Sequence, residues 1–122
     1  MELSEIRNKL ETYGQKVEDF RDLDRLEEEI ALLDNDMAEP DFWNDNEAAQ
    51  KVIDESNALK AKYENFMSIA TLHEDSEVLL EMLQEEDDED MQVELEENVE
   101  KLGKKIETYE LEIMLNQPYD HM

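Results

Sequence analysis

The sequence predicts an all-α protein, an elongated antiparallel three-helix bundle of the coiled-coil type. Apolar residues recur three and four positions apart along most of the chain, which is the period of an amphipathic helix. The 122 residues include only two glycines and two prolines, and 39% of them are charged, a composition typical of long helices. At this length we expect a single domain, residues 1–122.

The first helix is expected over residues 2–38. Its apolar stripe begins with Leu3, Ile6, Leu10, Tyr13, Val17 and Phe20. From Val17 to Leu26 the apolar residues are all three apart, so the stripe slips by about one residue there. We therefore expect a kink, a break or local overwinding near residues 20–25. Gly14 weakens the helix by about 1 kcal/mol relative to alanine without ending it.

The turn after this helix holds the residues that we single out as structural. They are Pro40, Phe42, Trp43, Asn44 and Glu47. Pro40 ends the first helix, and Asn44 with Glu47 predicts a capping box at the start of the next. Trp43, the only tryptophan, is expected to fold back with Phe42 and to close the end of the bundle. If Trp43 is buried in this way, its replacement by alanine costs about 3 kcal/mol or more.

The second helix is expected over about residues 45–86. Its stripe is Ala49, Val52, Ser56, Leu59, Tyr63, Phe66 and Ala70, and it resumes with Val78, Leu79, Met82 and Leu83. The polar stretch "HEDSE" lies between these two halves and contains neither glycine nor proline. The sequence therefore leaves open whether the helix bends there.

The third helix is expected over about residues 89–116, with Asp87 or Asp88 as its cap and Pro118 as its stop. Its stripe is Met91, Leu95, Val99, Leu102, Ile106, Tyr109 and Ile113. A further set of apolar residues lies outside the stripes: Ile69, Leu111, Met114 and Leu115. We expect this set in the core, and a docking patch is the alternative.

The charge of the chain is strongly negative. Eleven lysines and arginines against 37 acidic residues give a formal net charge of −26, and no lysine or arginine lies between Lys62 and Lys101. Such a chain repels phosphate backbones, so we expect no direct binding of nucleic acid. We interpret the acidic region first as a solvated face, and a basic protein surface as its natural partner is the alternative.

The sequence contains no pattern for catalysis or for a cofactor. The only histidines, His73 and His121, have no second ligand at metal-binding spacing, and cysteine is absent. The acidic run at residues 85–90 lacks the glycine of a calcium loop. We therefore expect no enzyme activity, cofactor or metal site. With no signal peptide and no apolar run long enough for a membrane, we expect a cytoplasmic protein.

The stretch "LEEEIALLDNDMAEPDFWNDNEAAQKV", residues 26–52, resembles the first helical turnaround of the bacterial peptide chain release factor 2 family. The most specific part is "EPDFWND". The opening "MELSEIRNKLE" and the closing "YELEIMLNQPYD" are similar to the same family, so the resemblance extends over nearly the whole chain. It implies an N-terminal helical domain.

The family directs translation termination at UAA and UGA codons, using a Ser-Pro-Phe tripeptide and a Gly-Gly-Gln loop. Neither motif is present in this sequence, so the resemblance implies that the catalytic and decoding domains are absent and that the chain alone releases no peptide. It implies docking at the stalk base of the large ribosomal subunit and contact with the class II release factor GTPase. The alternative hypothesis is a free-standing acidic adaptor or nucleic-acid mimic that binds a basic protein.

Overall fold

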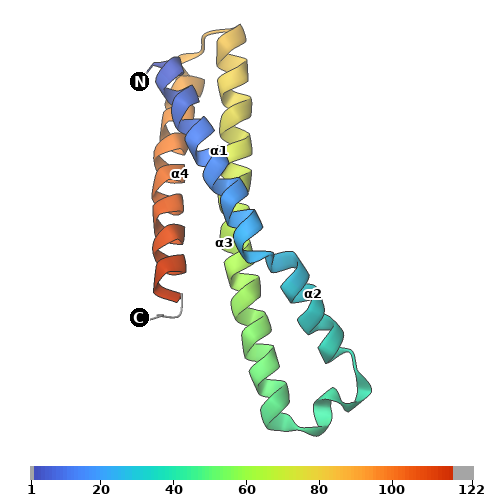
Figure 1. Ribbon diagram of the computed structural model, residues 1–122. Coiled ribbons are helices and arrows are strands. Elements are labelled where there is room, and N and C mark those ends of the chain that lie inside the picture. The colour runs from blue at the N-terminus through green and yellow to red at the C-terminus, as the bar shows by residue number, and fades with distance from the viewer. Residues whose placement is uncertain (1, 117–122) are drawn as a thin grey trace. The chain divides into compact units, whose positions relative to one another are not determined.

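The computed structural model describes residues 2–116. In this range the chain is helical with no strand, which confirms the all-α class and the helical bundle. The elements are α1 (Leu3–Asp24), α2 (Leu26–Met37), the 3-10 helix η1 (Pro40–Asn44), α3 (Asn46–Glu85) and α4 (Glu89–Asn116), labelled or traceable in Figure 1. The expected stop at Pro118 lies outside the described residues.

The chain forms two compact units. Among the described residues, the first contains 2–18 and 68–116, and the second contains 19–67. The first unit is therefore built from the start of α1, the last part of α3 and all of α4, whereas the second contains the end of α1, α2, η1 and the first part of α3.

Three helical segments pack together in the first unit. Leu10 of α1 contacts His73 of α3, and Lys16 of α1 donates a hydrogen bond to Glu110 of α4. Because only a short turn joins α3 to α4, these two helices run in opposite directions (Figure 1). The predicted stripes of the first and third helices fill this core. Its buried apolar side chains include Ile6, Leu10, Val17, Leu95, Val99, Leu102, Ile106 and Tyr109.

Both glycines of the chain lie where an aromatic side chain of another helix approaches the backbone. A Cβ atom on Gly14 would lie 2.9 Å from Nε2 of His73, and a Cβ atom on Gly103 would lie 2.8 Å from the hydroxyl oxygen of Tyr13. Since such contacts are shorter than van der Waals distance, both glycines permit a close approach between helices. The adjacent residues Tyr13 and Gly14 thus join α1 to α4 and to α3.

Helix α3 is continuous through the "HEDSE" stretch. The reason is that the buried stripe does not stop there but passes through polar residues, His73 and Ser76, before Leu80 and Leu83. Ser76 is accommodated because its hydroxyl donates to the carbonyl oxygen of Leu72, 2.8 Å away.

The expected return of the stripe at Val78 and Met82 is wrong. Val78 is 53% exposed and Met82 is 46% exposed. The residues of α3 that face the core here are Ser76, Leu80 and Leu83. The set outside the predicted stripes is divided in the same way. Ile69 is buried as expected, but Leu111, Met114 and Leu115 are exposed.

In the second unit, the region expected as one helix over residues 2–38 is interrupted at Arg25. This residue has φ 46° and ψ 45°, the left-handed conformation, which costs a residue other than glycine about 1–2 kcal/mol. Its amide donates to the carbonyl oxygen of Arg21 in α1, and its own carbonyl oxygen accepts from Glu28 and Glu29 in α2. The interruption lies at the end of residues 20–25, where the slip of the apolar stripe predicts a kink or break. It allows the next apolar residue, Leu26, to face the core, where it is 7% exposed.

Candidate functional site

The five structural residues of the sequence analysis lie between α2 and the first turn of α3. Pro40 is the first residue of η1, where its missing amide proton costs no helical hydrogen bond. Glu39 before it is extended, with φ −70° and ψ 136°, as a residue before proline prefers. The amide of Phe42 donates to the carbonyl oxygen of Glu39 at 3.1 Å, which closes the turn.

The cap of α3 is Asp45 rather than the expected Asn44. The Asp45 Oδ1 atom accepts hydrogen bonds from the amides of Glu47 and Ala48, both at 3.1 Å. The 3-10 helix continues through Asn44, so the first residue with the extended backbone that a cap requires is Asp45, with φ −113° and ψ 104°. Glu47 therefore acts through its backbone amide in this cap.

Trp43 does not close the end of the bundle as expected. Its side chain is 55% exposed, and it meets the half-buried Phe42 edge to face, with ring centroids 4.8 Å apart. The physical reason is the 3-10 geometry: with three residues per turn, neighbouring side chains point in directions about 120° apart. Phe42 and Trp43 therefore cannot both face inward. Trp43 is therefore an exposed aromatic residue of this turn.

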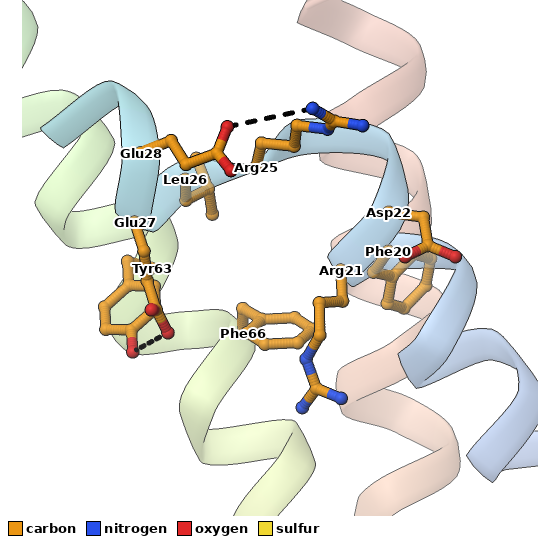
Figure 2. A pocket seen from close by; sticks show the side chains of 9 residues that line it. All are labelled: Phe20, Arg21, Asp22, Arg25, Leu26, Glu27, Glu28, Tyr63 and Phe66. Atoms are coloured by element: carbon orange, nitrogen blue, oxygen red, sulfur yellow. Dashed lines mark hydrogen bonds and ion pairs between the residues drawn. The ribbon is translucent and has the colours of Figure 1, made fainter. Parts of the chain in front are cut away.

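A pocket of about 280 Å³ lies in the second unit beside the helix interruption. It is lined by Phe20, Arg21, Asp22, Arg25, Leu26, Glu27, Glu28, Tyr63 and Phe66 (Figure 2). The left-handed residue between α1 and α2 turns the chain here, so that the two helix ends and the facing part of α3 surround the pocket.

Several polar and charged side chains of this pocket interact with their neighbours. The Tyr63 hydroxyl donates to Oε1 of Glu27 at 2.7 Å, and the guanidinium of Arg21 lies over the ring of Phe66, 5.4 Å from its centroid. This hydrogen bond to a carboxylate, with some desolvation, raises the pKa of Tyr63 above its ordinary value of 10.0. Histidine, serine, threonine and cysteine are absent from the residues that line this pocket.

The described residues also contain no metal centre. No group of three or more histidine, cysteine, aspartate or glutamate side chains is placed to hold a metal ion between residues 2 and 116. His73 is a structural residue, buried against α1, with Nε2 2.7 Å from the carbonyl oxygen of Leu10. Since a carbonyl only accepts, Nε2 is the donor. None of the described helices is both long enough and apolar enough to cross a membrane.

Comparison with known proteins shows the family of the chain. A model of the PCRF domain family matches residues 26–122. The chain belongs to the PCRF domain family. The match begins at Leu26, the first residue of α2, and so includes η1, α3 and α4.

The relatives of this PCRF domain extend the match into α1. Peptide chain release factor 2 of Exiguobacterium sp. is 50% identical over 123 residues, which cover 98% of this chain and 34% of that relative. The proteins of the same name from Listeria innocua and Staphylococcus epidermidis are 49% and 42% identical over 98% of this chain. The resemblance to release factor 2 is thereby confirmed. The chain spans about a third of the length of these curated relatives.

Sequence reasoning missed Asp45 and the pocket residues Arg21, Arg25 and Tyr63. Asp45 carried a signal, because aspartate is as good a cap as asparagine. The slip of the apolar stripe predicted the break beside this pocket. It did not predict which side chains would surround the break.

Proposed function

We propose that this chain is the N-terminal helical region of a bacterial class I peptide chain release factor of the release factor 2 type. The observation that carries the proposal is the PCRF domain match to residues 26–122, supported by 42–50% identity to release factors 2 over 98% of the chain. In this function the chain takes part in translation termination at UAA and UGA codons, in the cytoplasm.

The role of the region is docking rather than chemistry. The printed sequence has no Gly-Gly-Gln loop, and its glycines, Gly14 and Gly103, are far apart in the chain, so the chain alone does not hydrolyse peptidyl-tRNA. Its partner is the ribosome at the stalk base of the large subunit, together with the class II release factor GTPase. The net charge of −26 supports a contact with basic ribosomal protein rather than with RNA phosphates.

Co-sedimentation of the purified chain with bacterial ribosomes tests this function. We expect the chain to sediment with ribosomes, to be displaced by an unlabelled full-length release factor 2 and to release no peptide from termination complexes. Failure to bind, or binding that an excess of the full-length factor leaves unchanged, would contradict the proposal.

The acidic adaptor is the second candidate, and the charge of the chain is the observation that favours it. An adaptor of this kind binds a basic protein other than a ribosomal one, with a strong dependence on salt. Displacement by the full-length factor separates the two functions, since an adaptor has no reason to share a ribosomal site with a release factor.

A further inference from the structure

An open groove of about 700 Å³ runs between α1 and α4 in the first unit. Its apolar lining, called the floor below, consists of Tyr13 of α1 and of Val93 and Val99 of α4. Gly103 also lines it, and the absence of a Cβ atom at this position admits the hydroxyl group of Tyr13. Val93 is 55% exposed, so this apolar floor reaches solvent.

The rim of the groove is mostly negative. Four carboxylates line it, from Glu96, Glu97, Glu100 and Glu107, against the two ammonium groups of Lys9 and Lys104. Lys104 lies 3.5 Å from Glu100, where both side chains are largely exposed; this pair neutralises one charge of each sign, and the rim stays net negative. An apolar floor between acidic walls is complementary to an amphipathic helix with apolar residues on one face and lysines or arginines beside them.

We propose that this groove is a docking site for a basic amphipathic helix of a partner protein. The inference deepens the proposed function and rests on it for the source of the helix, which is a ribosomal protein. Charge excludes the other occupants. A nucleic acid would bring its phosphates against the carboxylate rim, and a second copy of the chain would bring another formal charge of −26 to the same surface.

A charge-reversal pair tests the groove without changing its core. The variant E97K/E107K alters two exposed residues of the rim, and the matched control E74K/E81K makes the same change at exposed positions of α3 that do not line the groove. The probe is a synthetic amphipathic peptide with leucines on one face of its helix and lysines on the other. We expect E97K/E107K to weaken peptide binding about tenfold more than the control does.

Nuclear magnetic resonance locates the bound peptide. The amide signals of Tyr13, Val93 and Gly103 should shift more than those of α3 residues around Glu74. Equal weakening by the two variants, signals that shift mainly outside the groove, or no binding of the peptide would overturn the inference.

A second measurement identifies the partner on the ribosome. A photocross-linking amino acid, p-benzoylphenylalanine, replaces the exposed Val93, and the chain is irradiated with bacterial ribosomes. We expect a cross-link to a ribosomal protein that E97K/E107K removes and E74K/E81K retains. A cross-link to ribosomal RNA alone, or sedimentation with ribosomes without any cross-link, would overturn the groove and leave the proposed function standing. A chain that does not sediment with ribosomes contradicts the proposed function, and the peptide experiment then decides the groove by itself.

Discussion

The Nε2 atom of His73 donates a hydrogen bond of 2.7 Å to the carbonyl oxygen of Leu10. This bond inserts an imidazole ring of α3 against the backbone of α1, one turn before Gly14. The ring fits because Gly14 has no Cβ atom, which would lie 2.9 Å from Nε2 and 3.0 Å from Cε1. Close packing and a buried hydrogen bond therefore depend on the same pair of residues.

Replacing Gly14 by alanine should destabilise the chain. The added methyl group overpacks a buried, hydrogen-bonded ring at a cost of about 1–3 kcal/mol. The better helix propensity of alanine returns about 1 kcal/mol. We expect the free energy of unfolding, measured by urea denaturation, to fall by about 1 kcal/mol.

The matched control is Gly103→Ala. Its Cβ would meet the hydroxyl oxygen of Tyr13 at 2.8 Å, but this atom is the end of a half-buried side chain that lines an open groove and can shift. The helix propensity should then dominate, so stability should rise by as much as about 1 kcal/mol. Equal destabilisation by Gly14→Ala and Gly103→Ala would contradict this account, in which the His73 ring is held in place and the Tyr13 side chain can shift.

Replacing Asp45 by alanine should cost about 1 kcal/mol, because it removes the acceptor for two amides at the start of α3. Asn44→Ala should change the free energy of unfolding by less than about 0.5 kcal/mol, since Asn44 is exposed and ends η1. Denaturant titration of both variants measures the difference. If Asn44→Ala lowers the free energy of unfolding more than Asp45→Ala does, Asn44 is the cap, as the sequence predicts.

Trp43→Ala should cost only about 1 kcal/mol, since more than half of the side chain is exposed and its edge contact with Phe42 contributes about 0.5–1.5 kcal/mol. The fluorescence of Trp43, the only tryptophan, should show the red-shifted emission of an indole in water. A loss of about 3 kcal/mol with blue-shifted emission would show that Trp43 is buried after all.

The Tyr63–Glu27 hydrogen bond predicts a pH dependence at the alkaline end. Because the pKa of Tyr63 is raised in the folded chain, the neutral hydroxyl is the form that folding favours. Its contribution is complete below the ordinary tyrosine pKa of 10.0 and is lost as the pH rises through the higher folded value.

Ultraviolet absorbance of tyrosinate measures this titration, and Tyr63→Phe identifies which of the four tyrosines is observed. In Glu27→Gln the pKa of Tyr63 should move down toward its ordinary value, since the charged acceptor is gone. An unchanged titration in Glu27→Gln would contradict the hydrogen bond.

Much of the fold could be predicted from periodicity, because a helical stripe reports which positions face the core. Leu10, Val99 and Ile106 are buried as expected, and the interruption at Arg25 lies where the stripe slips. Periodicity failed at Val78 because not every core position in this part of α3 is apolar. In this part of α3 the core contains His73, whose polar atom is satisfied by a neighbouring backbone.

The turn around η1, the pocket beside Arg25 and the groove between α1 and α4 were harder to predict. A one-residue extension of η1 moved the cap from Asn44 to Asp45 and rotated Trp43 outward, and no local propensity distinguishes these registers. The groove beside Gly103 depends on how α1 and α4 pack, which is a tertiary property. The sequence therefore indicated the family and the charge of the chain but not the concave surfaces on it.

A chimaera tests the central claim most directly. This chain would replace the matching region of release factor 2 from Exiguobacterium sp., with which it shares 50% identity. If the chain is the corresponding region of a release factor, the chimaera should release peptide from ribosomes stopped at UAA and UGA codons at a rate within about tenfold of the intact factor. A chimaera that folds, as judged by circular dichroism, but releases no peptide where the intact factor does would contradict the claim.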